Sequence, residues 1–463
     1  MIRLLVSAPA SGCGKTAVSC ALLRIFRERG LNPCAFKCGP DYIDPMFHRA
    51  CLNVESRNLD LFLSDAGTVR TQFARGCRGR GAAVIEGAMG YYDGLGGTTD
   101  RASARQLADT LDVPVLLVLP AHGAGLTLAA AVRGLQSFRT PCRIKAVILN
   151  DCSPALCRKL APMLEQETGI PVLGCLPRVP EAAVESRHLG LLTAQEIRDL
   201  DGRLSALARA MEENVNLARL TELFDGAVPE AEPPSSPPPK RCRIAAARDE
   251  AFCFAYAETF ETFAERGAEI VFFSPLHDAA LPERIGGLYL PGGYPELYAR
   301  RLSENAAMRR AVAGAVRAGL PTVAECGGFL YLGTALAAPD GERFPMAGVL
   351  PGEAADAGRL TRFGYAELIA DRNSLLFRAG DRIPVHEFHR WDSTENGRDF
   401  RLRKPISGIE WKAGFAGGSL YAAFPHLYFA GSPILAERLI RAAEKYGAEH
   451  GTDGTAEQNH AAG

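Results

Sequence analysis

The sequence has no long apolar run and almost no net charge. No stretch approaches the ~18 apolar residues that a membrane-spanning helix needs. A formal net charge of −1 over 463 residues gives no reason to expect nucleic acid or an anionic membrane as a partner. The N-terminal run MIRLLVSAPA is short and leads directly into a motif, so we expect no cleaved signal. We therefore expect small-molecule ligands and a cytoplasmic monomer or homodimer.

The thirteen cysteines include no C-x-x-C pair. An odd number of scattered cysteines in a long chain indicates reduced, mostly buried thiols rather than a disulfide framework. Cys34 with Cys38, or Cys152 with Cys157, would need a second pair to complete a metal site, and none follows. This number and spacing of cysteines is typical of a cytosolic protein.

The length predicts two or three domains, each with its own core. Short apolar runs alternate with helical patterns and no internal repeat is visible, which favours parallel sheets with crossover helices. The segment 226–242 is rich in proline and predicts an extended linker. We expect one domain over 1–225, a second over 243–445, and a disordered tail over 446–463.

Several elements can be assigned from their apolar patterns. The expected strands are Ile2–Val6, Ala82–Ile85, Val113–Leu119, Ile144–Leu149, Ile270–Phe273, Leu288–Leu290 and Thr322–Glu325. A helix is expected to follow the first strand and to end at Gly30, and another covers Glu304–Ala318.

A glycine-rich segment between the first strand and the first helix is similar to a phosphate-binding loop. The segment consists of Ser11, Gly12, Cys13, Gly14, Lys15 and Thr16. It supplies backbone N–H groups, a helix N-terminus, a lysine and a hydroxyl group, which are the parts that a phosphate site requires. Pro9 replaces the first glycine of the pattern G-x-x-x-x-G-K-[ST], and other loop geometries allow the same turn. The segment predicts an ATP site with Mg²⁺ at Thr16.

Two further segments place acids near this loop. The strand AAVIE ends in Glu86, whose carboxylate can hold Mg²⁺ directly or through water. The segment KCGPDYIDPMFH carries Asp41 and Asp44, which suit magnesium binding or substrate positioning. Asn150 closes the strand AVILN, where it either faces an adenine edge or caps the strand.

The second half carries the parts of a thiol hydrolase. In PTVAECGGFLYL, Cys326 lies on a sharp turn between a strand and a helix, whose N-terminus is expected to favour the thiolate. Gly292 and Gly293 of LPGGYPE, with the N–H of Gly327, are the predicted oxyanion hole. His426 in YAAFPHLYF is the predicted base. The order Cys before His fits a class I glutamine amidotransferase.

Two details of the second half leave questions open. Class I glutaminases often place a glutamate two residues after the histidine, but Tyr428 stands there, so a Cys–His dyad is expected and the group that orients His426 is open. The segment HEFH, His386 to His389, looks like a metal pair without a third ligand, which favours a structural role.

Six segments together resemble the cobyrinate a,c-diamide synthase family. They are APASGCGKT, KCGPDYIDPMFH, VIEGAMGYYDG, PGGYPE, AECGGFLYL and HEFHRWD, in the family's order and over nearly the whole chain. The resemblance implies an α/β protein: a dethiobiotin-synthetase-like, mostly parallel ATP domain, then a flavodoxin-like class I glutamine amidotransferase domain. It also implies that ATP activates the a- and c-acetate carboxylates of cobyrinate as acyl phosphates, and that ammonia from glutamine converts them to amides.

The resemblance extends to individual residues. It implies magnesium binding by Thr16, Asp41 and Glu86, and substrate binding by Asp44, Asp93, Arg57, Arg187 and His188. The arginines suit pairing with the carboxylates around a corrin.

Two alternatives stay open at this point. The same chemistry would serve hydrogenobyrinate or nickel sirohydrochlorin. A protein of another class, a regulatory ATPase with an inactive glutaminase half, is disfavoured because Cys326, His426 and the glycine pair are intact.

Overall fold

A computed structural model of the protein describes residues 1–182, 199–230 and 238–450. The chain divides into two units, residues 1–233 and 234–463. The division falls inside the proline-rich segment 226–242, of which residues 231–237 lie outside the described ranges.

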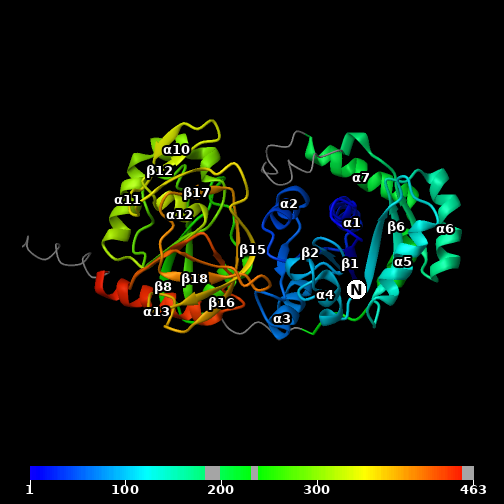
Figure 1. The fold of residues 1–463 in the computed structure, drawn as a ribbon, viewed down its shortest axis with the longest axis horizontal. Coiled ribbons are helices and arrows are strands. Elements are labelled where there is room, and N and C mark those ends of the chain that lie inside the picture. Colours follow the sequence, from blue (N-terminus) through cyan, green and yellow to red (C-terminus); the bar gives the residue numbers. More distant parts are fainter. Residues whose placement is uncertain (183–198, 231–237, 451–463) are drawn as a thin grey trace, which may run out of the picture. The chain divides into compact units, whose positions relative to one another are not determined.

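The first unit is built on a seven-stranded parallel sheet in the order β3-β2-β4-β1-β5-β6-β7 (Figure 1). Its strands are β1 (Ile2–Ser7), β2 (Cys34–Cys38), β3 (Ser56–Leu59), β4 (Ala82–Glu86), β5 (Val115–Pro120), β6 (Ile144–Asn150) and β7 (Val172–Leu176). Since β1 lies between β4 and β5, the loops that follow β1 and β4 meet at the carboxyl edge of the sheet, where ligands of such sheets bind.

Helices cover both faces of this sheet, and each face has its own core. The helices of the first face are α1 (Lys15–Glu28), α2 (Ile43–Leu52), α7 (Leu200–Asn214) and α8 (Leu217–Phe224). Those of the second face are α3 (Ala66–Cys77), α4 (Ala104–Leu111), α5 (Thr127–Ser137) and α6 (Pro154–Thr168). Two short 3-10 turns, η1 (Leu95–Gly97) and η2 (Pro180–Ala182), complete the unit.

The expected elements of this unit are found with small shifts. Helix α1 buries Val18, Leu22 and Ile25 completely, and Gly30 follows its end with a φ of 72°. The strand expected from Val113 begins two residues later, at Val115, because the N–H of Val113 donates to the carbonyl oxygen of Ala108 at the end of α4.

The second unit has a central six-stranded sheet in the order β20-β21-β11-β10-β8-β9, parallel except for β20. Its strands are β8 (Cys242–Ala247), β9 (Ala268–Phe273), β10 (Gly287–Leu290), β11 (Thr322–Glu325), β20 (Phe415–Ala416) and β21 (Leu420–Ala423). Its helices are α9 (Ala257–Ala264), α10 (Ala299–Glu304), α11 (Ala306–Arg317), α12 (Gly327–Leu332) and α13 (Pro433–His450), with a 3-10 turn η3 (Pro295–Tyr298).

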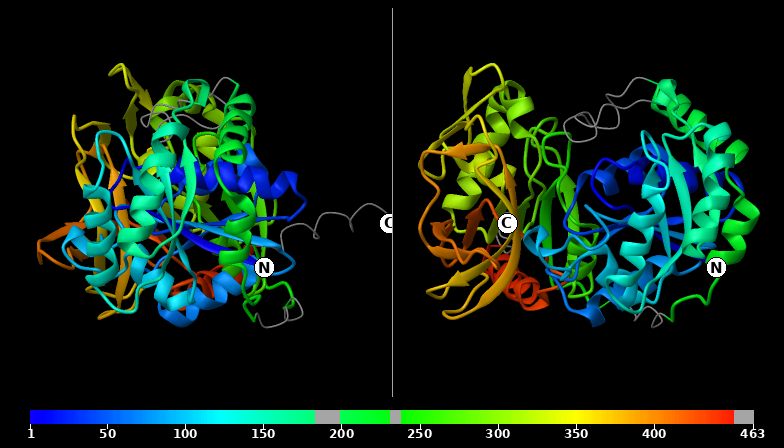
Figure 2. Two further views of the ribbon diagram at one scale, coloured as in Figure 1. Left: turned by 90° about the vertical axis from the view of Figure 1, so that its right-hand side faces the viewer. Right: turned by 45° about the vertical axis from the view of Figure 1, so that its right-hand side comes forward.

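Two mainly antiparallel sheets, which the sequence did not predict, pack beside the central sheet of this unit. One has the order β13-β12-β14-β17 and the other β19-β18-β15-β16-β22. Their strands are β12 (Ala335–Ala337), β13 (Arg343–Pro345), β14 (Glu353–Asp356), β15 (Arg362–Ala370), β16 (Arg382–His389), β17 (Trp391–Ser393), β18 (Phe400–Arg403), β19 (Glu410–Ala413) and β22 (His426–Leu427). Figure 2 shows their yellow and orange strands beside the green strands of the central sheet. The larger of the two shares a core with β8, β10 and β11.

The end of the second unit differs from expectation. The tail was expected from residue 446, but α13 continues to His450, where Tyr446 and His450 stack and the imidazole Nδ1 of His450 lies 3.0 Å from the carbonyl oxygen of Tyr446. The expected tail was therefore wrong for residues 446–450. None of the helices in the described ranges combines the length and apolar character that a membrane span demands.

Candidate functional site

The glycine-rich loop of the first unit joins β1 to α1. Gly14 is the N-terminal cap of α1, with a φ of 94° that favours glycine. A side chain there would also collide with the amide of Asn150 at the end of β6. That amide donates from Nδ2 to the carbonyl oxygen of Cys13 at 3.1 Å. Asn150 thus holds the loop in place, a contact that neither sequence-based alternative included.

Lys15 connects the loop to the segment after β4. Its ammonium group donates to the carbonyl oxygens of Ala10 at 2.9 Å and Met89 at 2.6 Å. Burial lowers the pKa of Lys15, and the nearby ammonium group of Lys37 lowers it further. Ser11 and Gly12 lie at the exposed tip of the loop. The loop therefore presents its tip to solvent and keeps its lysine close to the backbone.

Glu86, the last residue of β4, is buried beside the first turn of α1. The hydroxyl of Thr16 donates to its Oε1 at 2.7 Å, and the ammonium group of Lys37 donates to the same oxygen at 3.0 Å. Lys37 also pairs with Asp44 and lies 4.0 Å from Oδ2 of Asp41. The structure thus brings Thr16, Glu86, Asp41 and Asp44 together around one lysine.

Opposing effects set the charges of this cluster. Burial alone would lower the pKa of Lys37, but the carboxylates of Asp44 and Glu86 outweigh burial and raise it well above its usual value. Burial would raise the pKa of Glu86, but Lys37 and then His48 lower it below its usual range. Lys37 is therefore charged and Glu86 ionised at neutral pH.

Lys37 and His48 are functional candidates that the sequence reasoning did not single out. His48 is fully buried in α2, with Nε2 3.6 Å from Oε2 of Glu86 and Nδ1 3.1 Å from the hydroxyl of Ser56. Both residues belong to the segment KCGPDYIDPMFH, but only the strand register shows that Lys37 lies opposite Glu86.

The residues around Glu86 suit a magnesium ion that is completed by phosphate. Among the described residues there is no group of three or more His, Cys, Asp or Glu side chains arranged to hold a metal. A nucleotide-bound Mg²⁺ needs fewer, because it takes one or two protein ligands plus phosphates and water. The hydroxyl of Thr16 beside the ionised Glu86 supplies two oxygens of the required kind.

Asp93 shapes the segment after β4. Its Oδ2 accepts a hydrogen bond from the N–H of Gly90 at 2.9 Å, next to the Met89 carbonyl that binds Lys15. Asp93 also raises the pKa of Lys15, against the larger effect of burial. It therefore lies within electrostatic reach of the loop lysine.

Arg57, which was expected to bind the substrate, lies away from this cluster. In β3 it lies opposite Phe36, one position away from the Lys37–Asn58 pair, and alternation along a strand turns it to the other face of the sheet. There it is buried and pairs with Glu55. The expected substrate residues Arg187 and His188 lie outside the described residues.

Cys326 occupies a sharp turn between β11 and α12, as expected. Its backbone has a φ of 47° and a ψ of −104°, a strained conformation for a residue with a Cβ. Its N–H donates to the carbonyl oxygen of Ala423 in β21 at 2.9 Å, which fixes the turn to the neighbouring strand. The geometry is that of a nucleophile elbow.

The expected oxyanion glycines and His426 surround this turn. A Cβ on Gly292 would lie 2.5 Å from Cε1 of His426 and 3.4 Å from Cβ of Cys326. A Cβ on Gly327 would lie 3.0 Å from the backbone nitrogen of Gly293. The structure therefore brings all five predicted residues of this centre together.

The thiol of Cys326 is subject to opposing effects. Burial raises the pKa of Cys326 well above its usual value, and the carboxylate of Glu296 raises it further, whereas the N–H of Gly327 lowers it only in part. The N-terminus of α12 favours the thiolate through the N–H of Gly327, as expected, but burial has the larger effect on the pKa of Cys326. A protonated thiol needs a base.

His426 lies in the short strand β22, which pairs with β16 so that His426 is opposite His386. Tyr428 is buried and packs edge-on against Tyr256, so it cannot replace the missing acid. The carboxylate of Glu325, a residue that the sequence reasoning passed over, has Oε2 3.7 Å from Nδ1 of His426.

The HEFH segment forms no metal pair. Strand alternation turns His386 and His389 to opposite faces of β16. His389 stacks on Phe424 with ring centroids 3.6 Å apart, and burial lowers the pKa of His386 to about 3, helped by His426 and Lys404.

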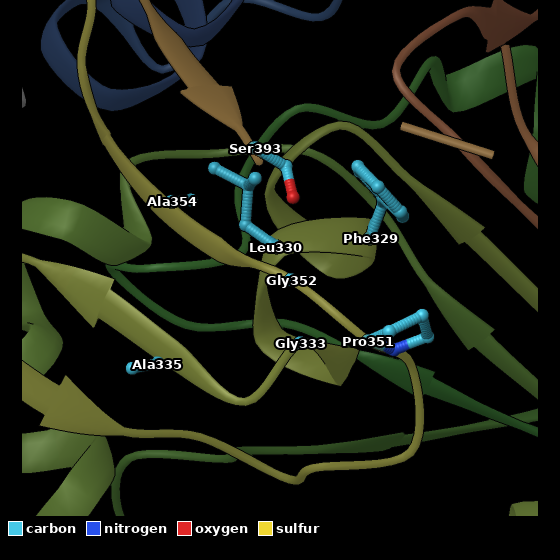
Figure 3. A pocket seen from close by; sticks show the side chains of 8 residues that line it. All are labelled: Phe329, Leu330, Gly333, Ala335, Pro351, Gly352, Ala354 and Ser393. Carbon is cyan, nitrogen blue, oxygen red and sulfur yellow. The ribbon is translucent and has the colours of Figure 1, made fainter. Parts of the chain in front are cut away.

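A small pocket in the second unit is separate from the thiol site (Figure 3). Its wall includes Phe329 and Leu330 of α12, Gly352 just before β14, and Ser393 of β17. Neither Cys326 nor His426 lines it, so we assign it no part in the chemistry.

Comparisons with known proteins match a different protein family to each of the two units. Residues 4–191 match the CobQ/CobB/MinD/ParA nucleotide binding domain, and residues 243–434 match the CobB/CobQ-like glutamine amidotransferase domain. The cobyrinate a,c-diamide synthase of Salmonella typhimurium is 37% identical over 452 residues, covering 95% of this chain and 98% of that protein.

Two further matches differ in how much of the chain they cover and in how similar they are to it. The cobyrinate a,c-diamide synthase of Dehalococcoides mccartyi is 34% identical over 460 residues, covering 96% of this chain and 98% of that protein. Among solved structures, PurLQS from Thermotoga maritima matches 44% of this chain and 99% of that chain at 15% identity, and its TM-score of 0.33 is too low to support an argument.

Proposed function

The chain belongs to the cobyrinate a,c-diamide synthase family, and from that premise we propose which residues perform each half of the reaction. The protein is a carbon–nitrogen ligase that converts the a- and c-acetate carboxylates of cobyrinate to amides, with ATP as the energy source and glutamine as the amide donor. The relatives' names do not favour hydrogenobyrinate or nickel sirohydrochlorin, and a regulatory ATPase is likewise not favoured.

The first unit activates the carboxylate. A carboxylate is a poor electrophile near neutral pH, and phosphorylation gives it a good leaving group. We assign ATP binding to the loop from Ser11 to Thr16, where Lys15 and the N-terminus of α1 offset charge on the transferring phosphoryl group. Asn150 supports this by holding the loop at the carbonyl of Cys13.

Magnesium and the acids complete this half. Mg²⁺ would neutralise phosphate charge, and Thr16 and Glu86 would hold it, with Asp41 on the same side. Asp44 and Lys37 would position the carboxylate and the phosphoryl group, because Lys37 links Asp44 to Glu86. Asp93 would assist them from the segment after β4, whose Met89 carbonyl binds Lys15. Arg57 is left out of this set because it faces away from Lys37.

The second unit releases ammonia. His426 takes the proton of the Cys326 thiol, and the resulting thiolate attacks the side-chain carboxamide of glutamine to form a carbon–sulfur bond. The N–H groups of Gly293 and Gly327 stabilise the oxyanion. His426 returns the proton to the leaving nitrogen, ammonia departs, and water hydrolyses the thioester to glutamate. Ammonia then displaces phosphate from the activated carboxylate.

The observation that best supports this assignment is the elbow at Cys326, with its φ of 47° and with His426 and Cys326 both adjacent to Gly292. Its test is the variant Cys326→Ala. Glutamine-dependent amidation should fall below about a thousandth of the wild-type rate. Amidation with free ammonia should persist, because the first unit is untouched; products are counted by mass spectrometry.

Two further variants complete this test. Cys157→Ala, which removes another buried thiol, should leave both activities intact. Lys15→Ala should abolish ATP-dependent amidation with either nitrogen source while glutamine hydrolysis persists. A Cys326→Ala protein that still uses glutamine would exclude the thiol from the mechanism.

We also propose a cytoplasmic location. The cysteines that the structure describes are free thiols, which supports a reducing compartment. A monomer or homodimer is the simplest state for an enzyme whose two centres lie on one chain.

A further inference from the structure

Glu325 lies directly before the nucleophile and directly beside the base. It is the last residue of β11, and its side chain and that of His426 are both only 1–2% exposed. Oε2 of Glu325 and Nδ1 of His426 are 3.7 Å apart. A strand end followed by a sharp turn can therefore supply two functional groups from consecutive residues, the carboxylate of Glu325 and the thiol of Cys326.

The carboxylate is held from two sides. The hydroxyl of Tyr289 in β10 donates to Oε2 at 3.0 Å, and the N–H of Leu427 donates to Oε1 at 3.1 Å. Leu427 is the second residue of β22, so one oxygen of Glu325 is bonded to the strand that carries His426. A group fixed in this way has little freedom to turn away from the imidazole.

The other titratable groups near the ring do not offer the same contact. His386 faces His426 across the β16–β22 pair, and its pKa of about 3 keeps it neutral at neutral pH. Glu387 is next to His386 in β16, so its side chain turns to the opposite face of that strand, toward His389.

We propose that Glu325 is the positioning residue of the glutaminase centre, a role that rests on the function proposed above for Cys326 and His426. Its carboxylate holds the Nδ1–H of His426, so that Nε2 is the nitrogen that accepts the thiol proton. When that proton arrives, Glu325 stabilises the imidazolium without accepting a proton itself. The distance of 3.7 Å is of the kind that shortens when substrate binds. The acid missing at Tyr428 is thus supplied by the strand before the nucleophile.

The decisive variant is Glu325→Gln, which keeps the size of the side chain and removes its charge. The kcat of glutamine hydrolysis should fall about 100-fold. The KM for glutamine should change little, because Glu325 does not touch the substrate. Amidation with free ammonia should stay at the wild-type rate, which reports a folded protein. An unchanged kcat would overturn the proposal.

A matched control separates positioning from a general effect of charge. Glu387 is also 1% exposed, and like Glu325 it raises the pKa of Cys326 through its charge. Glu387→Gln should therefore lower kcat far less than Glu325→Gln. Equal losses in the two variants would mean that any buried charge near the thiol has this effect, and would overturn the proposal.

Two further measurements keep the proposal testable if Glu325→Gln fails to fold. Tyr289→Phe removes one bond to Oε2 and leaves the carboxylate in place, so it should lower kcat by an intermediate factor; a wild-type kcat in this variant would count against the proposal. In ¹⁵N spectra of histidine-labelled protein, with His426→Ala for assignment, His426 should carry its proton on Nδ1. A proton on Nε2 in the wild-type protein would refute the arrangement.

The outcomes also separate this inference from the proposed function. If Cys326→Ala still uses glutamine, the thiol mechanism fails and Glu325 has nothing to position. If Cys326→Ala loses glutamine use while Glu325→Gln keeps the wild-type kcat, only the role of Glu325 fails.

Discussion

Gly292 carries a hydrogen atom where any other residue would carry a Cβ, and the space beyond it belongs to the catalytic pair. A Cβ there would lie 2.5 Å from the His426 ring, closer than nonbonded carbon atoms approach. Glu325 on the Nδ1 side of the ring and the pairing of β22 with β16 limit how far the ring can move back. The glycine therefore sets the distance between base and nucleophile.

We predict that Gly292→Ala lowers glutamine hydrolysis by about 100-fold, because the methyl group displaces His426 from Cys326. Amidation with free ammonia should persist. Gly314→Ala is a suitable control: nothing lies within 4 Å of its missing Cβ, and alanine should stabilise helix α11 by about 0.5–1 kcal/mol. Both effects can be measured by a glutaminase assay and chemical denaturation. Wild-type glutaminase activity in Gly292→Ala would show that the ring moves freely.

The positively charged Lys37 lies close to three acidic side chains, those of Asp41, Asp44 and Glu86. Burial and the charge of Glu86 raise the pKa of Asp44 well above its usual value, and the ammonium group of Lys37 offsets this in part. In the function proposed above, this cluster would lie beside the phosphate groups and the magnesium ion.

At the scale of elements, helix α1 joins core packing to the proposed nucleotide-binding loop. Its N-terminus begins at Lys15, and its buried stripe packs on the sheet and against α7. A loss of packing in this stripe should therefore weaken the first unit and the loop in front of the helix together.

We predict that Leu22→Ala destabilises the first unit by about 2–5 kcal/mol, because Leu22 is fully buried in this core. Leu126→Ala, at a side chain that is 66% exposed, should change stability by less than about 0.5 kcal/mol. Chemical denaturation followed by circular dichroism measures both. Equal stabilities of the two variants would contradict the assigned core.

Strands could be predicted where their apolar runs were continuous, whatever their length. The apolar runs of β1, β4, β6 and β11 were recognisable because a strand buried on both faces is continuously apolar. The strands from β12 to β19 were not, because they mix exposed with buried positions, even in β15 and β16, which have nine and eight residues. β22 has only two residues and is defined by its partner β16.

At the scale of the whole molecule, each unit has its own cores. The buried clusters of the first unit contain residues up to Phe224, and those of the second begin at Ile244. Neither cluster set shares a residue with the other. Each unit should therefore unfold as its own cooperative transition.

We predict two transitions in differential scanning calorimetry. A nonhydrolysable ATP analogue with Mg²⁺ should raise one transition, since it binds only the folded first unit. Leu22→Ala should lower the same transition and leave the other unchanged. A single transition that moves as a whole with either change would contradict independent cores.

The two chemistries could be predicted from the amino-acid sequence alone, because each depends on consecutive residues: a loop from Ser11 to Thr16 before a helix, and Cys326 between a strand and a helix. Backbone N–H groups and a helix N-terminus follow from local geometry, so a short motif suffices to predict them. The residues that complete each centre come from distant parts of the chain, and folding brings them together. Lys37 meets Glu86 through strand pairing, Arg57 turns away through strand alternation, and Glu325 reaches His426 across about a hundred residues of chain. Burial, which raised the pKa of Cys326, likewise arises only when the whole unit folds around it.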